Sequence, residues 1–140
     1  GRRINDNMGE FITSQVVKLM LQNRVQVCGA RILILGLTFK ENCPDTRNTR
    51  VVDIIRELQD YNTTVDVYDP WVKGTEVKDD YQIDMTCELK IHTYDAIIIA
   101  VAHDIFRDLG AEKIKALGKP NCIIYDIKSL LSINDVDGRL

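Results

Sequence analysis

Apolar residues recur at helical spacing near the start of the chain. They lie three or four positions apart at Met8, Phe11, Ile12, Val16, Leu19 and Met20. Asn7 and Glu10 together resemble a capping box, which marks the start of a helix. The pattern predicts an amphipathic helix over about residues 7–22 that exposes an apolar stripe. Such a stripe would drive dimerisation.

Short apolar runs then alternate with helical patterns. The runs at 31–36, 64–68, 95–102 and 122–127 predict buried strands, and helices are expected at 49–60, 104–109 and 111–117. The span 71–93 predicts loops with a short strand or helix. This alternation is typical of an α/β fold. We expect an open parallel Rossmann-like sheet of four or more strands with flanking helices, preceded by the amphipathic linker helix.

Polar groups follow three of the predicted strands. They are the segment 38–47 after Gly36, the pair His103-Asp104, and the pair Lys128-Ser129. Ligands of open parallel sheets bind at the carboxyl ends of the strands, and right-handed crossovers bring those ends to one edge.

Positive charges from two of these groups would converge at that edge. Lys40, Arg47 and Lys128 would then form a phosphate site beside the amino end of the helix that begins near Thr49. In the alternative interpretation, Lys40, Arg47 and Arg50 form surface pairs with nearby acidic residues: Glu41, Asp45 and Asp53.

The sequence lacks the glycine pattern of a dinucleotide-binding turn. No two glycines are separated by one residue, and Gly36 is followed by bulky Leu37. The domain is therefore not expected to hold the pyrophosphate of NAD on its own first helix. Asp69 could hold a ribose, but starting the Asp-Pro turn is the favoured role.

Other candidates have more than one interpretation. His103 could be a general base, although lining the crevice or capping the next helix is favoured. Thr38 is a further crevice candidate. Phe39 could stack on a base or belong to the core. Cys43 has no nearby histidine, so a structural role in the loop is favoured over a catalytic thiol.

Composition and charge narrow the function classes. The net charge of -3 argues against a surface built to bind nucleic acid. The longest apolar run, 96–102, is too short for a membrane span, and no signal peptide is recognisable. The four cysteines lack metal-ligand spacing, which indicates reduced thiols in the cytoplasm and no metal site. Because the chain begins Gly-Arg-Arg, we expect it to be part of a longer protein.

The segment 36–49 resembles the G-x-x-F-K-x-x-x-x-D-x-R-x-[ST] signature of the UDP-glucose/GDP-mannose dehydrogenase family. The similarity continues at Tyr68-Asp69-Pro70, at 95–100 and at 125–128. The opening residues 3–6 are similar to the end of the long helix that links the two domains of that family. The resemblance covers nearly the whole chain.

The resemblance implies one half of a two-domain, dimeric enzyme. Residues 1–24 would end the interdomain and dimerisation helix, and residues 25–140 would form the UDP-sugar-binding domain. The missing amino-terminal domain would carry NAD and the catalytic cysteine. The enzyme would oxidise the C6 alcohol of a UDP-hexose to a uronate for cell-surface polysaccharide synthesis. This chain alone would hold no catalytic residue and would be inactive.

Roles of individual residues follow from the same resemblance. Phe39 and Lys40 would contact the UDP-sugar, Arg47 would reach NAD, and Lys128 would lie near the substrate. Lys128 departs from the Asp-Gly-Arg that is frequent in enzymes making UDP-glucuronate. This and other details favour a UDP-N-acetylhexosamine over UDP-glucose as substrate.

Two rival functions remain open on the sequence alone. The first is a self-sufficient small enzyme that uses His103 and Asp104. The second is a non-enzymatic dimerisation or nucleotide-binding module.

Overall fold

The chain forms a five-stranded parallel sheet with helices on both faces. The computed structural model describes residues 8–38, 40–46, 49–72, 83 and 85–140. The strands lie in the order β2-β1-β3-β4-β5, and every neighbouring pair is parallel. The elements in chain order are α2 (Met8–Gln22), β1 (Arg31–Leu35), α3 (Val51–Asp60), β2 (Thr64–Tyr68), β3 (Tyr94–Ile99), α5 (Asp104–Lys115), β4 (Gly118–Asp126), the 3-10 helix η1 (Ile133–Asp135) and β5 (Gly138–Arg139). The predicted fold class is confirmed.

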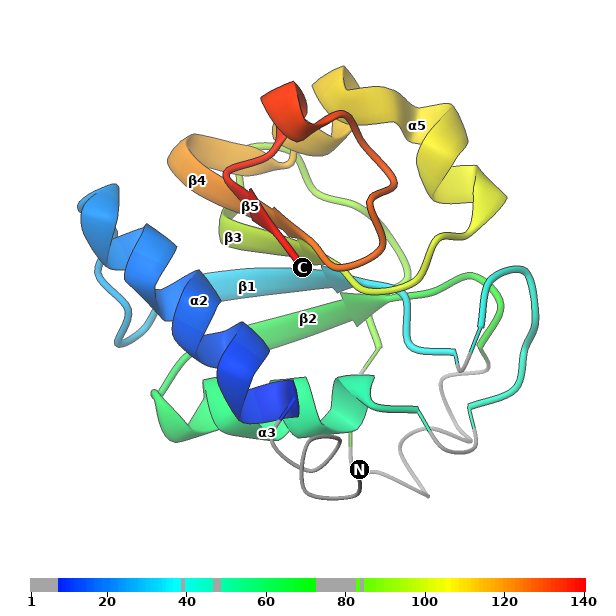
Figure 1. Ribbon diagram of the computed structural model, residues 1–140, viewed down its shortest axis with the longest axis horizontal. Helices are drawn as coiled ribbons and strands as arrows, with labels where there is room; N and C mark the ends of the chain where they lie inside the picture. Colours follow the sequence, from blue (N-terminus) through cyan, green and yellow to red (C-terminus); the bar gives the residue numbers. More distant parts are fainter. Residues whose placement is uncertain (1–7, 39, 47–48, 73–82, 84) are drawn as a thin grey trace.

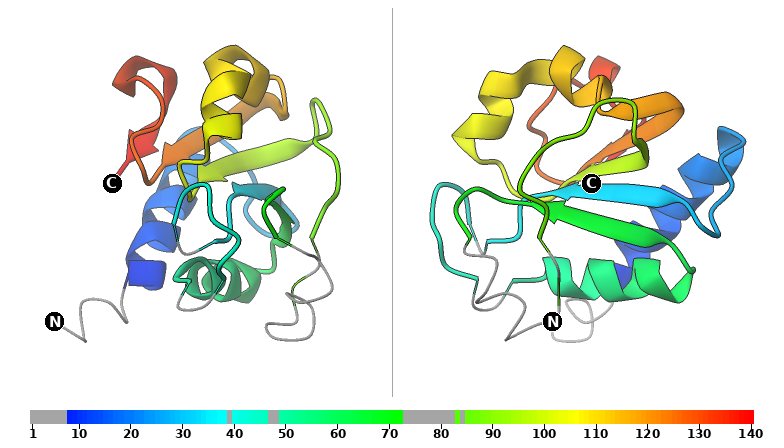
Figure 2. Two further views of the ribbon diagram at one scale, coloured as in Figure 1. Left: turned by 90° about the vertical axis from the view of Figure 1, so that its right-hand side faces the viewer. Right: turned by 180° about the vertical axis from the view of Figure 1, so that it is seen from behind.

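Two apolar layers cover the sheet, one on each face. Helices α2 and α3 lie side by side on one face, and α5 covers the other (Figures 1 and 2). Ile32 and Ile34 of β1 point into the α2/α3 layer, whereas Leu33 and Leu35 point into the α5 layer. Successive strand residues alternate between faces. A central parallel strand is therefore apolar throughout, as the run at 31–35 is.

Helix α2 contradicts one prediction about its apolar stripe. Ile12, Val16 and Met20 are at most 2% exposed, because α2 packs against α3 and the sheet. The prediction that this stripe is exposed is therefore wrong. Phe11, which the sequence pattern included in the stripe, and Leu21 lie away from this contact and are 50% and 62% exposed.

Element boundaries agree closely with the sequence patterns, with differences toward the carboxyl end. Gly110 (φ 78°, ψ 166°) breaks α5 into the two predicted short helices. Strand β4 begins at Gly118, earlier than the apolar run at 122 indicates. The short strand β5 was not predicted, because its two residues are too few to show a pattern. Among the described residues, no helix is long and apolar enough to cross a membrane.

Gly36 ends β1 at a point where three strand ends meet. Its N–H donates to the carbonyl oxygen of Tyr68 over 2.9 Å, and its φ is +104°. A Cβ at this position would lie 2.5 Å from Cβ of Val101. Only glycine satisfies both the left-handed backbone and this close approach. The loop after β1 is thereby held against the segment that follows β3.

We expect Gly36→Ala to lower the free energy of unfolding by about 3 kcal/mol, because strain and overlap act together. Gly29 is the matched control. Its φ is +83°, but no heavy atom lies within 4 Å of the point that an added Cβ would occupy. Gly29→Ala should therefore cost only about 1 kcal/mol. Urea unfolding of both variants measures the difference, and equal losses would contradict the role of Val101.

Candidate functional site

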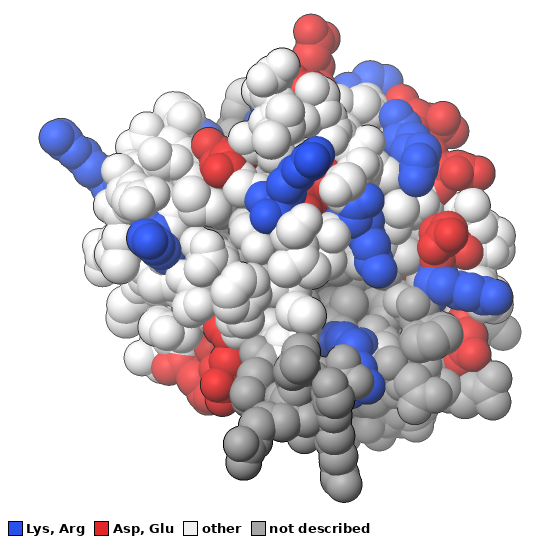
Figure 3. Space-filling view, in the orientation of Figure 1, with Lys and Arg blue, Asp and Glu red and all other residues white. Residues whose placement is uncertain are grey.

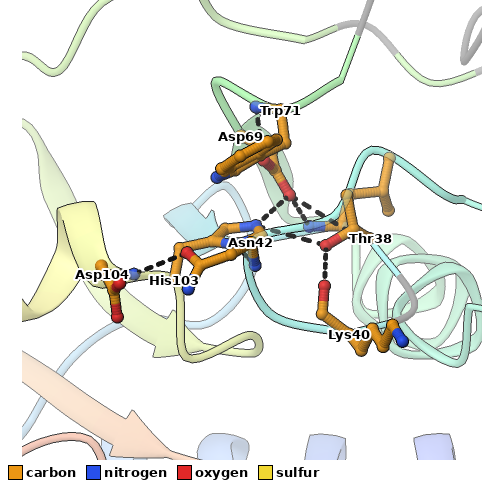
Figure 4. Close-up of polar contacts among 8 residues, drawn as sticks. Thr38, Lys40, Asn42, Asp69, Trp71, His103 and Asp104 are labelled. Carbon is orange, nitrogen blue, oxygen red and sulfur yellow. Dashed lines mark hydrogen bonds and ion pairs between the residues drawn. The ribbon is translucent and has the colours of Figure 1, made fainter.

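A buried histidine and a buried aspartate join the carboxyl ends of three strands. Asp69 follows β2 and is 4% exposed, whereas His103 follows β3 and is fully buried. Nε2 of His103 lies 2.9 Å from Oδ2 of Asp69. The same carboxylate oxygen accepts the backbone N–H groups of Leu37 (2.7 Å) and Thr38 (3.2 Å), which follow β1. One carboxylate therefore binds all three strand ends (Figure 4).

The hydrogen bonds of His103 assign its tautomer. Its Nδ1 accepts the backbone N–H of Asn42 over 2.8 Å, so this nitrogen carries no proton. The proton is therefore on Nε2, which faces both Asp69 and the hydroxyl oxygen of Thr38 at 3.2 Å. The imidazole is neutral in this arrangement, and both of its nitrogens bond protein groups. This geometry does not favour His103 as a general base, because no ring nitrogen is free to reach a substrate.

The pKa of Asp69 lies below its usual value. Burial alone would raise this pKa, but hydrogen bonds from His103 and from the backbone N–H groups of Leu37 and Trp71 outweigh it. These donors favour the ionised carboxylate. The bond from Trp71 to Oδ1, at 2.9 Å, is the turn predicted at Asp69-Pro70. Asp69 thus starts the turn and also holds the neighbouring loop.

The amide groups held by Asp69 are informative about dinucleotide binding. In a dinucleotide-binding fold, N–H groups of the turn after the first strand bind the pyrophosphate. Here the N–H groups of Leu37 and Thr38 bond a carboxylate of the protein itself. Helix α3 begins only at Val51, well after β1 ends. The residues of this turn therefore do not fit NAD in the usual position.

Further bonds order the loop that follows β1. The hydroxyl of Thr38 donates to the carbonyl oxygen of Lys40 over 2.8 Å. The side-chain oxygen of Asn42 accepts the N–H of Asp104 at the start of α5 (3.0 Å). The exposed Lys40 side chain points away from His103 (Figure 4). The loop is thus anchored on both sides of a lysine that faces solvent.

A pocket of about 280 Å³ opens at the same edge of the sheet, on the α2/α3 side. Arg50 and Lys128 bring positive charge to it, and the amino end of α3 lies at its wall. Lys and Arg side chains gather over the central part of this face (Figure 3). The lining residues are Met8, Ile12, Thr38, Thr49, Arg50, Val51, Ile54, Ala100, Ile127, Lys128 and Leu140. Cationic and apolar groups thus share one concave site.

A second buried carboxylate places Lys128. Asp126 ends β4, is fully buried, and accepts the N–H of Lys128 (3.1 Å) and of Leu131 (2.8 Å). These bonds fold the segment after β4 into a tight turn. The backbone that carries the exposed Lys128 is therefore ordered by hydrogen bonds, as is the backbone that carries Lys40.

The predicted site residues fall into different groups. Thr38 and Lys128 line the pocket, whereas His103 is buried, does not line it, and contacts the hydroxyl of Thr38. Lys40 lies two residues beyond Thr38 and is exposed. Phe39 and Arg47 lie outside the described residues. The convergence of Lys40, Arg47 and Lys128 therefore stays a prediction.

Arg50 and Asn42 are the residues that sequence reasoning missed. Arg50 was considered only as a partner for acidic neighbours. Between described residues, no ion pair joins Lys40 or Arg50 to Glu41 or Asp53. Arg50 lies in the first turn of the helix expected at 49–60, whose amino end was already assigned to the phosphate site, and this position was a usable signal. Asn42 gave no signal, because its partners are distant in sequence.

Among the described residues, no Cys, His, Asp or Glu lines the pocket. All four cysteines are free, and burial raises the pKa of Cys122 to about 12. Within the described part of the chain, no group of three or more His, Cys, Asp or Glu residues could hold a metal ion.

We expect Asp69→Asn to lower the free energy of unfolding at pH 7 by about 2 kcal/mol, because charged acceptors contribute more than neutral ones. The native pKa of Asp69 is depressed, so its contribution is complete above the unfolded pKa of about 4 and is lost as pH falls further. The gap between wild type and variant should therefore close below about pH 4. Urea unfolding between neutral and acid pH measures this gap. The exposed Asp108→Asn is the control, and a gap independent of pH would contradict the assignment.

Comparisons with known proteins agree with this architecture. A solved UDP-D-ManNAc dehydrogenase from Pyrococcus horikoshii superposes with a TM-score of 0.78 at 27% identity, over 99% of this chain and 31% of that one. UDP-N-acetyl-D-glucosamine 6-dehydrogenases from Pseudomonas aeruginosa and Salmonella typhi are 53% and 47% identical over the whole chain. This chain spans 33% of each of those two relatives.

A family model covers most of the chain. The model for the UDP binding domain of the UDP-glucose/GDP-mannose dehydrogenase family matches residues 33–133. This range contains the Asp69–His103 pair and most of the residues that line the pocket. The chain therefore belongs to the UDP-glucose/GDP-mannose dehydrogenase family, as its UDP binding domain.

Proposed function

We propose that this chain binds the UDP group of a UDP-N-acetylhexosamine within an NAD-dependent 6-dehydrogenase. One observation carries the proposal: the pocket joins Arg50, Lys128 and the amino end of α3 at the carboxyl edge of the sheet. Arginine and lysine side chains form charge-assisted bonds to phosphate oxygens, and a helix amino end favours negative charge. The names of the two relatives at 53% and 47% identity support the N-acetylhexosamine as substrate.

The volume of the pocket indicates which part of the ligand it can hold. About 280 Å³ is close to the lower limit for small-molecule sites. We therefore assign the pocket to part of the nucleotide, with the sugar extending toward the rest of the enzyme. Met8, Ile12 and Ile54 would supply apolar contacts, and Lys40 and Phe39 would add contacts from the neighbouring loop. Arg47 would reach NAD across the cleft.

Chemistry at C6 is assigned to the part of the enzyme outside this chain. None of the free cysteines lines the pocket, and the turn after β1 does not fit NAD. The chain also spans only a third of its curated relatives. Residues 1–24 would end the interdomain helix of a dimer, and residues 25–140 would supply binding energy that orients C6.

The same proposal places the enzyme in the cytoplasm, where thiols remain reduced. The free state of all four cysteines supports this location.

We expect Arg50→Ala and Lys128→Ala each to weaken UDP binding by about tenfold, because a partly shielded charged bond contributes about 1.5 kcal/mol. Isothermal titration of the full-length protein with UDP measures the effect. Matched controls are Arg56→Ala, from the exposed face of α3, and Lys113→Ala, from α5. No heat from wild-type protein, or equal losses in the controls, would refute the proposed function.

Lys40 and Arg47 should act on different ligands. Lys40→Ala should raise KM for the UDP-sugar by about tenfold or more, whereas Arg47→Ala should raise KM for NAD. Steady-state kinetics of the full-length enzyme separates the two. An unchanged KM in Lys40→Ala would remove Lys40 from the site. An effect of Arg47→Ala confined to the UDP-sugar would place Arg47 with the wrong ligand.

A further inference from the structure

We propose that His103 and Asp69 are a positioning pair that holds Lys40 in place for nucleotide binding. This inference rests on the proposed function, because it gives Lys40 a ligand to bind. Neither His103 nor Asp69 is among the residues that line the pocket. Lys40 is not among those residues either, so in this proposal it reaches the ligand from the loop after β1, and the pair acts through that loop.

The bonds of the pair lie on both sides of Lys40. Before it, Asp69 accepts the N–H groups of Leu37 and Thr38. After it, Nδ1 of His103 accepts the N–H of Asn42. The hydroxyl of Thr38, which contacts Nε2 of His103, also donates to the carbonyl oxygen of Lys40 itself. The buried pair thereby fixes the backbone that carries the exposed lysine.

This arrangement matters because no regular secondary structure orders this part of the loop. Residues 40–46 form no helix or strand, and Asn42 has a φ of 55°, which is unfavourable for most residues. Ordering the backbone of a flexible loop costs free energy, because conformational entropy is lost. If the loop were free, a ligand would have to supply that free energy on binding. A loop ordered in advance leaves more of the charged contact as affinity.

The chemistry of the pair is more specific than packing requires. His103 lies between Trp71 and Phe106, with ring centroids 6.1 Å and 5.4 Å away. An apolar side chain would fill this space without placing a polar group in it. Joining Asp69 to the N–H of Asn42 requires one side chain that carries both a hydrogen-bond donor and an acceptor, as the imidazole of His103 does. The imidazole therefore links two loops rather than only filling the core.

Two substitutions at His103 separate its role as a donor to Asp69 from its role as an acceptor for Asn42. His103→Gln can keep a donor near the Nε2 position, facing Asp69, but loses the acceptor for Asn42. His103→Asn can keep an acceptor near the Nδ1 position but loses the donor to Asp69. We expect each to weaken UDP binding about fivefold to tenfold, the effect of losing one or two hydrogen bonds that order the loop.

The deciding experiment is a double-mutant cycle in the full-length protein. UDP affinity is measured by isothermal titration for wild type, His103→Gln, Lys40→Ala and the double variant. If His103 acts through Lys40, His103→Gln should change affinity less than about twofold once Lys40 is alanine. A merely structural role would lower affinity by the same factor in both backgrounds, and that result would overturn the positioning pair.

Hydrogen exchange provides a second readout. In His103→Gln the peptide that covers residues 37–46 should exchange faster, while a peptide from β4 should remain as slow as in wild type. Equal exchange in the loop of both proteins would overturn the proposal. If His103→Gln fails to fold, Thr38→Val enters the same cycle, because it removes the bond to Lys40 and keeps the pair. Thr38→Ser should then restore affinity.

The outcomes distinguish the two proposals. No UDP heat from wild-type protein would refute the proposed function itself. Normal binding by wild type, weaker binding by Lys40→Ala and full affinity in His103→Gln would refute only the positioning pair. Full affinity in Lys40→Ala would refute the pair as well, since the loop would then have no lysine to position.

Discussion

The architecture of this edge of the sheet depends on one ionised carboxylate in a buried position. Asp69 accepts backbone N–H groups from the loop after β1 and the imidazole from the segment after β3. A buried charge is costly unless donors surround it, and here four N–H groups lie within hydrogen-bonding distance of its two oxygens. The loops cannot separate without leaving that charge unsatisfied. This constraint joins the loop after β1, the turn after β2 and the segment after β3 into one ordered rim at the edge of the sheet.

The rim explains why a Rossmann-like fold here need not bind a dinucleotide. In such folds the first turn offers free N–H groups to a pyrophosphate. In this domain the corresponding groups already bond Asp69, and Gly36 is followed by Leu37, which is fully buried. Under the proposed function, the anion would bind instead in the pocket lined by Arg50, Lys128 and the start of α3. A single carboxylate thus takes up the N–H groups that a pyrophosphate would otherwise need.

The sequence was sufficient for most of the fold and only for part of the site. Apolar runs such as 31–35 identify central parallel strands, because such strands are covered on both faces. Local patterns could not show that His103 faces Asp69 rather than its neighbour Asp104, since the partners are 34 residues apart. Nor could they show that α2 buries Ile12 and Val16 within this domain. An apolar stripe has the same sequence pattern whether it packs on its own domain or on a partner.

The wall of the pocket has a consequence for the helix that precedes the sheet. Met8 and Ile12 of α2 line the same cavity as Arg50 and Lys128. A ligand that touches both sides must bind more tightly when α2 is docked than when it is detached. By thermodynamic linkage, a bound ligand then favours docking of α2 by the same factor by which docking of α2 favours ligand binding. Under the proposed function, helix α2 would thus support the domain and also dock more firmly when the cavity is filled.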